Sequence, residues 1–346
     1  MSVKNIYDIT FSELETFFLN NGEKKYRASQ TFLWLYEKRV KSFLEMNNLN
    51  DESLKLLTDN FSFPILTMIN KQVSEDGTVK YLYKLKDGNY IETVIMRQNY
   101  GNSICVTSQV GCNMGCKFCA SGKLKKIRDL EAGEMIAQVI ESERDFAEKI
   151  SNIVVMGIGE PFDNYDNTMR FIKNANHHKG LNIGARHITA STCGLVPKIK
   201  EFSEEKLQVN LAISLHASND KLRDEIMPIN RKYKLKDVVD AIKYYMTKSN
   251  RRITIEYILL KDINDQKEHA IELANVLKGL NVYVNLIPYN EIVEVSYKKS
   301  STETLKNFQQ TLIDNKINAI FRQELGSDID AACGQLRSKT VKGERV

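Results

Sequence analysis

Long apolar runs are missing from this 346-residue chain, and proline is scarce, with five residues. No apolar stretch approaches the roughly 20 residues that a membrane-spanning helix needs, so we expect no membrane span. The N-terminal stretch MSVKNIYDITFSELETFF lacks an apolar segment followed by a small-residue cleavage site, which argues against secretion. Low-complexity tracts are absent as well. Together these absences predict a cytoplasmic globular protein with a sizeable core.

A strong net charge is also absent, because the chain carries +5 at pH 7. This mildly basic balance identifies no partner by itself, but basic residues gather in two places. One run consists of Lys123, Lys125, Lys126 and Arg128, and the C-terminal tail carries Arg337, Lys339, Lys342 and Arg345. Such runs are usually solvated surface, and nucleic-acid binding is the alternative.

Cysteine is present but unevenly placed. Four of the six cysteines fall within fifteen residues, namely Cys105, Cys112, Cys116 and Cys119. The other two, Cys193 and Cys333, lie far from them in the sequence. In a cytoplasmic protein such clustering indicates metal binding or catalysis rather than a disulfide framework.

The apolar pattern divides the chain into regions. Up to about residue 70 the pattern is helical, and it begins with a capping box formed by Thr10 and Glu13. Residues 79–96 alternate apolar and polar side chains around Asp87-Gly88, which predicts a β-hairpin. We therefore expect a helical domain over 1–75, a hairpin linker over 76–97 and a larger domain over 98–346.

The larger domain alternates short β-branched runs with helical stretches. The predicted strands are 103–109, 152–158, 186–192, 208–214, 252–260, 281–287 and 317–322. Strands and helices that alternate at this spacing indicate βα units around a parallel sheet. Six or seven units predict an α/β fold with an incomplete TIM-type barrel, whose active site lies at the carboxyl ends of the strands.

The most informative motif is C-x3-C-x2-C, formed by Cys112, Cys116 and Cys119 directly after the first of these strands. Three thiolates suit a [4Fe–4S] cluster and leave one iron open. Structural zinc is the alternative, but zinc takes four ligands, and the sequence offers no second C-x2-C or H-x3-H pair. An open iron can bind the amino and carboxylate groups of S-adenosylmethionine (SAM). The motif therefore predicts a radical SAM enzyme.

Candidate SAM contacts follow at the ends of later strands. Glycines in the segment 156–161, MGIGEP, allow the backbone to approach a ligand closely, and Glu160 is a candidate for binding the SAM ammonium group. The other strand-end candidates are Ser191, Ser214, Leu215, His216 and Asn290. Each of these residues alone would more often have a structural role. The prediction rests on their shared position at the carboxyl ends of strands.

These motifs, in this order, resemble the RlmN-type radical SAM methyltransferases. The resemblance runs through YRASQ (26–30), IETV (91–94), CVTSQVGCNMGCKFCAS (105–121), MGIGEPFDNYDN (156–167), LAISLHASND (211–220), MPIN (227–230), NLIPYN (285–290) and DIDAACGQL (328–336). It implies methylation of carbon 2 of an adenosine in 23S rRNA and of an adenosine in the tRNA anticodon loop. It also implies a (βα)6 radical SAM barrel with a small N-terminal RNA-binding domain.

The family's residue roles carry over onto the matching positions. The cluster ligands become Cys112, Cys116 and Cys119. The SAM contacts become Gly159, Glu160, Ser191, Ser214, Leu215, His216 and Asn290. The methyl-carrying cysteine becomes Cys333, its resolving partner Cys105 and the proton acceptor Glu92. Cys193 has no role in this scheme and is interpreted as a spare buried thiol.

The implied chemistry consumes two SAM molecules in each turnover. The first methylates Cys333 to S-methylcysteine, and the second supplies a 5′-deoxyadenosyl radical that takes hydrogen from that methyl group. The carbon radical adds to the base, and Cys105 then attacks the sulfur of Cys333, which frees the RNA and leaves a disulfide. The implied partners are 23S rRNA, tRNA and an external one-electron donor such as flavodoxin, and we expect a monomer.

Two alternatives stay open at the level of sequence. Cfr-type enzymes methylate carbon 8 of adenosine and share these cysteines, but Gly159-Glu160-Pro161 and the run 217–220 resemble the carbon-2 group. A zinc-stabilised RNA-binding module without catalysis is the alternative from another class. Iron and sulfide analysis distinguishes the zinc module from an iron–sulfur enzyme.

Overall fold

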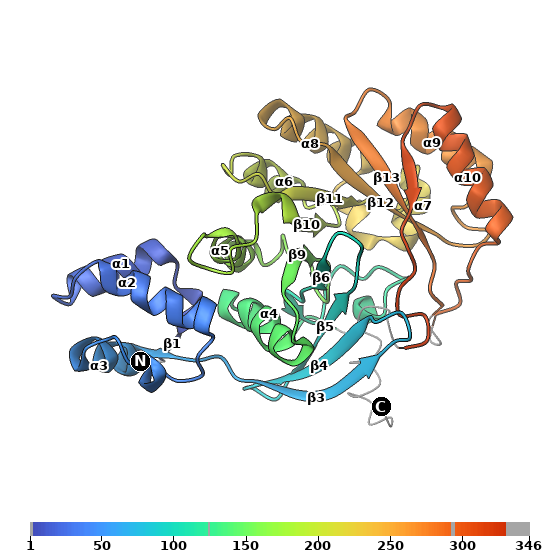
Figure 1. The fold of residues 1–346 in the computed structure, drawn as a ribbon. Helices are drawn as coiled ribbons and strands as arrows, with labels where there is room; N and C mark the ends of the chain where they lie inside the picture. Colours follow the sequence, from blue (N-terminus) through green and yellow to red (C-terminus); the bar gives the residue numbers. More distant parts are fainter. Residues whose placement is uncertain (1–2, 124, 292–294, 330–346) are drawn as a thin grey trace.

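The computed structural model describes residues 3–123, 125–291 and 295–329. Cys333 and the basic C-terminal tail lie outside the described residues. In Figure 1 the N-terminal helices lie at one end of the molecule, and the helices near the C-terminus lie at the other. Among the described residues, no helix combines the length and the apolar character that crossing a membrane requires.

The N-terminal part is helical, as predicted. It contains β1 (Lys4–Asn5), α1 (Phe11–Asn20), α2 (Tyr26–Phe32), α3 (Asp51–Asn60) and β2 (Phe61–Ser62), with β1 and β2 paired in parallel. The Thr10–Glu13 capping box at the start of α1 is confirmed, with the Thr10 amide donating to Glu13 Oε2 at 2.8 Å. This part packs on the larger domain through Asp8, whose carboxylate accepts a hydrogen bond from the Gly133 amide at 2.6 Å.

One ten-stranded sheet forms the centre of the larger domain. Its order is β14-β13-β12-β11-β10-β9-β6-β5-β4-β3, parallel from β6 to β14 and antiparallel from β3 to β6. The strands are β3 (Leu66–Val73), β4 (Val79–Leu85), β5 (Tyr90–Met96), β6 (Asn102–Cys105), β9 (Ile150–Val155), β10 (Ile188–Thr192), β11 (Asn210–Ser214), β12 (Ile253–Leu259), β13 (Val282–Pro288) and β14 (Ala319–Phe321). All seven predicted strands of the larger domain are therefore present, and the incomplete parallel barrel is confirmed.

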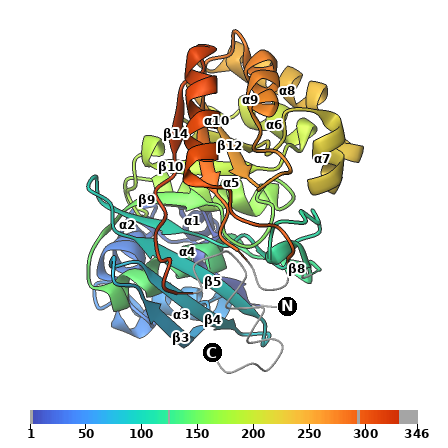
Figure 2. The ribbon, with the colours of Figure 1, turned by 90° about the vertical axis from the view of Figure 1, so that its right-hand side faces the viewer.

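The predicted hairpin differs from the expectation in two respects. Its strands β4 and β5 pair as expected, but β5 also pairs with β6, so the hairpin continues the barrel sheet. Residues 66–73 fell in the region that we expected to be helical, yet they form the edge strand β3 beside β4. Figure 2 shows β3, β4 and β5 side by side. β4 is buried on both faces along most of its length, and β3 pairs along the edge that β5 leaves open.

Helices follow most of the parallel strands and cover one face of the sheet (Figure 1). They are α4 (Ala132–Phe146), α5 (Tyr165–Asn176), α6 (Val196–Ser203), α7 (Asp220–Ile226), α8 (Leu235–Lys248), α9 (Lys267–Leu277) and α10 (Thr302–Asp314). A short antiparallel pair, β7 (Gln109–Val110) with β8 (Arg128–Asp129), brackets the cysteine motif.

Side chains that alternate along the strands separate an apolar face from a polar face. Ile153, Ile213 and Ile255 belong to the main hydrophobic core beneath the helices. The neighbouring positions point to the other face, where register pairs Ser214 with Glu256 and Glu256 with Asn285. The polar face also carries Lys80, Glu92, Cys105, Ser191 and Thr254. The sequence thus builds its core on one side of the sheet and leaves polar side chains on the other.

Candidate active site

The three-cysteine loop packs against α7 and the turn that follows it. The Lys117 amide donates to the Ile226 carbonyl at 2.9 Å, and the Cys119 amide donates to the Cys116 carbonyl at 3.2 Å. Gly115 has φ +68°, and a Cβ atom there would lie 3.6 Å from Pro228 Cγ. Glycine permits this left-handed turn, which folds the loop back on itself.

The three thiols lie near one another in a buried environment. Burial raises the pKa of the Cys112 thiol to about 12, and the nearby Cys119 and Glu160 act in the same direction. Burial also raises the pKa of Cys116 well above its usual value, with Cys119 and Cys112 acting in the same direction. Such thiols are protonated at neutral pH unless a metal centre displaces their protons, which metal coordination does readily.

The donor set fits an iron–sulfur cube better than a single metal ion. Across the described ranges, no three His, Cys, Asp or Glu side chains converge closely enough to hold one ion. A cube of four irons keeps its thiolates further apart than a single zinc ion does, because each thiolate binds a different corner. Three mutually interacting thiols on one loop therefore suit the cluster, while the described residues bring no group of donors together that could close a four-ligand zinc site.

The segment 156–161 lies tightly against the end of β6. A Cβ atom on Gly157 would lie 2.7 Å from Thr107 Oγ1, and one on Gly159 would lie 2.6 Å from Gln109 Cβ. Gly159 also has φ +110°, a conformation that L side chains rarely adopt. Both glycines are required by this close approach, which places Glu160 beside the cysteine loop.

Glu160 is buried and already accepts hydrogen bonds from the protein. Its carboxylate accepts from the Cys193 amide at 2.8 Å and from the Phe162 amide at 3.0 Å. Burial raises the pKa of Glu160, and these backbone donors oppose the shift. Cys193 is buried against the same carboxylate, so it belongs to the site rather than to a remote part of the core.

His216 connects the end of β11 to the cysteine loop. Its backbone has φ +56°, and its Nδ1 atom accepts from the Ile258 amide at 3.0 Å. The Phe118 ring, which lies between two of the motif cysteines, packs edge-to-face on the His216 ring with centroids 4.9 Å apart. Burial lowers the pKa of His216 to about 3, and the charge of Arg223 adds to the effect, so the imidazole is neutral.

The remaining strand-end candidates are less closely joined. Ser191 and Ser214 both lie on the polar face of the sheet, where Ser191 is buried and Ser214 half-buried. Leu215 is fully buried. Asn290 is exposed beyond the end of β13, although its neighbour Tyr289 packs in the small apolar cluster that also contacts Cys116.

Glu92 and Cys105 lie on the polar face, on the antiparallel side of the site. Val94 is paired with Cys105, and Glu92 points to the same face two residues earlier on β5. Thr107 ties this strand to the glycine segment, because its hydroxyl donates to the Glu92 carbonyl at 2.6 Å and accepts from the Ile158 amide at 3.2 Å. Cys333, the predicted methyl carrier, lies outside the described residues.

Two buried cations were missed by the sequence reasoning. Lys80 forms an ion pair with Glu92 at 3.0 Å, and Arg223 donates hydrogen bonds to the carbonyls of Leu215 and Cys193. The alternation of side chains along β4 could have placed Lys80 on the same face as Glu92, but it could not have predicted that Lys80 is buried. No sequence signal distinguishes Arg223 from a solvated helix residue.

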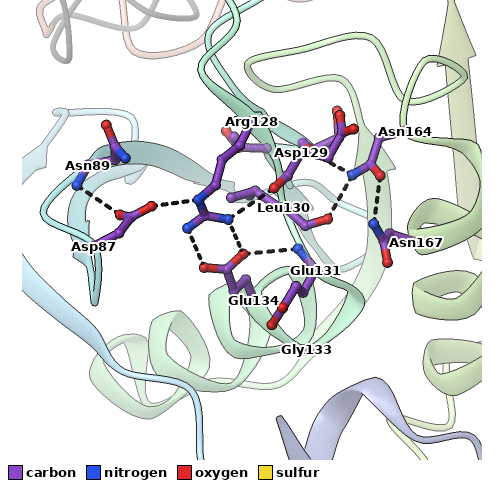
Figure 3. A network of polar contacts seen from close by, with 12 residues as sticks. Asp87, Asn89, Arg128, Asp129, Leu130, Glu131, Gly133, Glu134, Asn164 and Asn167 are labelled. Atoms are coloured by element: carbon purple, nitrogen blue, oxygen red, sulfur yellow. Dashed lines mark hydrogen bonds and ion pairs between the residues drawn. The ribbon is translucent and has the colours of Figure 1, made fainter. Parts of the chain in front are cut away.

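The basic run at 123–128 is only partly available for binding. Lys126 pairs with Asp129 at 2.7 Å and with Asp163 at 2.8 Å. Figure 3 shows the Arg128 guanidinium between the carboxylates of Asp87 and Glu134, to which it donates at 2.5–2.8 Å. Lys126 and Arg128 therefore form ion pairs within the protein, while the Lys125 side chain is exposed to solvent.

Comparisons with known proteins assign the chain. A model of the radical SAM superfamily matches residues 106–274, and a model of the ribosomal RNA large subunit methyltransferase N-terminal domain matches residues 4–61. The probable dual-specificity RNA methyltransferase RlmN of Acholeplasma laidlawii is 58% identical over 97% of this chain and 99% of its own length. The chain belongs to the RlmN family.

Two further comparisons agree, one with a curated relative and one with a solved structure. The probable dual-specificity RNA methyltransferase RlmN of Enterococcus faecalis is 54% identical over 100% of this chain and 99% of its own length. The crystal structure of a radical SAM methyltransferase from Sphaerobacter thermophilus has a TM-score of 0.90 and 41% identity over 96% of this chain and 98% of that one. The predicted fold and the prediction of a radical SAM methyltransferase are confirmed, and the non-catalytic zinc module is excluded. Superfamily membership implies a [4Fe–4S] cluster and SAM.

Proposed function

We propose that this chain methylates carbon 2 of one adenosine in 23S rRNA and of one adenosine in the tRNA anticodon loop. RlmN relatives that carry the name of dual-specificity RNA methyltransferases match it from end to end, at 53–58% identity. The observation that carries the proposal is the polar face of the sheet. It holds Cys105, Glu92, Ser191 and Ser214 on one side of a single sheet, next to the cysteine loop.

Cys112, Cys116 and Cys119 are proposed to hold the cluster. When bound, the cluster supplies the electron that cleaves SAM, and SAM supplies both the transferred methyl group and a 5′-deoxyadenosyl radical, so two SAM molecules are consumed in each turnover. The proposed SAM contacts are Gly159, Glu160, Ser191, Ser214, Leu215, His216 and Asn290. Gly159 lets the backbone approach the ligand, and Glu160 offers a carboxylate oxygen to the ammonium group.

Cys333 and Cys105 are proposed to carry and release the methyl group. Cys333 takes a methyl group by thiolate displacement and becomes joined to the base. Glu92 removes the proton from carbon 2, and the adduct gives its unpaired electron back to the one-electron partner. The Cys105 thiolate then attacks the sulfur of Cys333, the carbon–sulfur bond breaks, and the released carbon takes a proton to complete the methyl group, which frees the RNA and leaves a disulfide. Cys105 ends β6 beside the face that carries Glu92, which suits two groups that act on the same adduct.

The segment that leads to Cys333 is anchored near this place. The Gly326 amide donates to Asp76 Oδ2 at 2.7 Å, and the Glu75 amide donates to Asp328 Oδ2 at 3.1 Å. Both contacts lie in the turn between β3 and β4, on the antiparallel part of the sheet. Cys333 is five positions beyond Asp328, and this length of chain reaches at most about 17 Å.

The remaining assignments concern partners and domains. The N-terminal domain, proposed over 1–75, serves RNA binding. The hairpin at 76–97 links it to the radical SAM barrel domain at 98–346, which ends in the segment with the catalytic cysteine. An external one-electron donor such as flavodoxin reduces the cluster, and the protein acts as a cytoplasmic monomer. The target adenosine leaves its stack to reach the polar face, as bases do in other base-modifying enzymes.

The test is the position of the methyl group. Total RNA from cells with and without the enzyme is digested, and its methyladenosines are separated. The expected result is 2-methyladenosine in 23S rRNA and in tRNA, lost in cells without the enzyme. Methylation of rRNA alone removes the tRNA part of the proposal. Mainly 8-methyladenosine assigns the chain to the Cfr-type activity instead.

A further inference from the structure

Arg223 on α7 is a fully buried cation close to the cysteine loop. Its exposed fraction is 0%. Its guanidinium donates to the carbonyls of Cys193 at 2.6 Å and Leu215 at 3.2 Å, and to that of Tyr233 at 3.3 Å. One side chain therefore joins the ends of β10 and β11 to the segment after α7.

The acceptors that satisfy Arg223 are uncharged. Besides the three carbonyls, its guanidinium donates to Asn230 Oδ1 at 2.9 Å. Within the described part of the chain, no carboxylate lies within ion-pair distance of Arg223. The nearest acidic groups, Asp220 and Asp224, are reached through the Asn230 amide, which donates to them at 2.9 and 2.7 Å.

A buried charge without a close counter-charge is costly. The effective penalty for burying an ion is several kcal/mol, and carbonyl hydrogen bonds offset only part of it. A structural role alone would be served by uncharged donors. The arrangement therefore calls for a negative charge that is present in the working enzyme.

The cysteine loop places that charge beside Arg223. Cys193, whose carbonyl accepts from Arg223, packs in the same apolar cluster as Cys116. The loop is also fixed to the end of α7, three residues beyond Arg223, by the hydrogen bond from the Lys117 amide to the Ile226 carbonyl. Burial lowers the pKa of Arg223, and Cys193 and Cys116 oppose this shift ahead of the carboxylates of Asp220 and Asp224, which agrees with the closeness of the two thiols.

We propose that Arg223 is the buried counter-charge of the iron–sulfur cluster and raises its reduction potential. The inference rests on the proposed ligation by Cys112, Cys116 and Cys119. A [4Fe–4S] cluster with three thiolate ligands has a net negative charge, and reduction adds to it. A fixed cation in a low-dielectric setting stabilises the reduced form more than the oxidised form. Arg223 thereby makes the electron that SAM cleavage requires easier to accept.

The test is a potentiometric titration of the cluster in the full-length enzyme without RNA and without SAM. Arg223→Gln removes the charge and keeps a hydrogen-bond donor, whereas Arg223→Lys keeps the charge and loses the planar fork. The matched control is Lys232→Gln, which removes a charge of the same sign from an exposed position nearby. Iron and sulfide contents are measured for every variant, so that potentials are compared at equal loading.

The expected result is a more negative potential for Arg223→Gln, on the order of a tenfold weaker electron affinity, or about 59 mV for a one-electron couple. Arg223→Lys should stay close to the wild type, and Lys232→Gln should shift less than Arg223→Gln because water screens its charge. If Arg223→Gln binds no cluster, Asn230→Asp keeps the arginine and sets a carboxylate against it, and the same negative shift is expected.

Three outcomes overturn the inference. An unchanged potential in loaded Arg223→Gln, or in Asn230→Asp, shows that the charge does not act on the cluster. Equal shifts in Arg223→Gln and Arg223→Lys assign Arg223 to holding the loops alone. A wild-type enzyme that binds no four-iron cluster at all overturns the proposed cofactor ligation instead, and the two failures are thereby distinguished.

Discussion

Lys80 Nζ lies 3.0 Å from Glu92 Oε2, and both side chains are buried, at 0% and 3% exposure. The pairing arises from the register of β4 and β5, which sets Leu82 opposite Glu92 and Lys80 opposite Val94. The two charged residues are thus diagonal neighbours on the polar face. A buried cation fixed beside the proposed proton acceptor holds the Glu92 carboxylate in one place.

Removing either partner of this ion pair should destabilise the protein. Lys80→Met leaves the Glu92 carboxylate without its cation, and Glu92→Gln leaves the Lys80 ammonium without its anion. Each should lower the free energy of unfolding by about 3 kcal/mol. The double variant Lys80→Met/Glu92→Gln should lose clearly less than the sum, as denaturant unfolding of the apoprotein measures. Additive losses would show that the two charges do not depend on each other.

The basic run at 123–128 should divide into two functions. Arg128→Gln breaks the contacts with Asp87 and Glu134 and should cost about 1 kcal/mol of unfolding free energy, without changing the salt dependence of RNA binding. Lys125→Gln should leave stability unchanged. If Lys125 contacts a phosphate, the slope of log binding constant against log salt should fall by about one unit. Equal salt-dependence slopes for both variants and the wild type would show that Lys125 does not contact RNA.

Much of the fold was predictable because periodicity records burial. The β-branched runs that become β9, β11 and β12 alternate with amphipathic helices, and this pattern has few solutions other than a parallel sheet with helices on one face. The cysteine motif was predictable for a different reason. Three thiols at such short spacing have no ordinary use in a core, so their spacing alone indicates a metal centre.

The missed residues depend on contacts between distant segments. Lys80 and Arg223 look solvated in the sequence because lysine and arginine are rarely fully buried. Their partners are distant in the sequence: Glu92 on β5 for Lys80, and the carbonyls of Cys193 and Leu215 for Arg223. The edge strand β3 was missed because its side chains are mostly exposed, so its strand character comes from pairing with β4. Local pattern cannot reveal such partners.

Substitution of single cysteines should distinguish the three cluster ligands from Cys193, which lies beside them without binding the cluster. Cys112→Ala, Cys116→Ala and Cys119→Ala should each abolish the absorption near 400 nm and the bound sulfide of the anaerobically purified enzyme. Cys193→Ala is the matched control, because Cys193 is a buried thiol that packs in the same apolar cluster as Cys116. It should retain the iron. Loss of the chromophore in Cys193→Ala alone would make Cys193 a ligand and displace one of the three.

The buried His216 should make stability fall as the pH is lowered. Its folded pKa of about 3 lies below the usual value near 6.5, so between these values the unfolded chain binds a proton that the folded chain does not. The group therefore costs about 1.4 kcal/mol of unfolding free energy for each pH unit below 6.5. In denaturant unfolding from pH 7 to pH 5, His216→Asn should show a shallower decline than the wild type. Parallel curves would mean that His216 is protonated in the folded protein.

Alanine variants of Cys333 and Cys105, the two cysteines proposed to act on the methyl group, should lose activity in different ways. Cys333→Ala has no methyl carrier, so no adduct with RNA can form, although the cluster and reductive SAM cleavage should remain. Cys105→Ala still accepts the methyl group and joins the base, but it has no thiolate to attack the sulfur of Cys333. Enzyme should therefore accumulate in covalent linkage with RNA.

That adduct can be recognised without assuming the mechanism. It should migrate slowly on a denaturing gel, disappear after nuclease treatment and be absent from the Cys105→Ala/Cys333→Ala double variant. Cys193→Ala serves as the matched control, because it removes a thiol that is also buried in the site while leaving both proposed participants in place. An inactive Cys105→Ala enzyme that never captures RNA would show that Cys105 is needed before the adduct forms, and the assignment of the resolving step to Cys105 would be wrong.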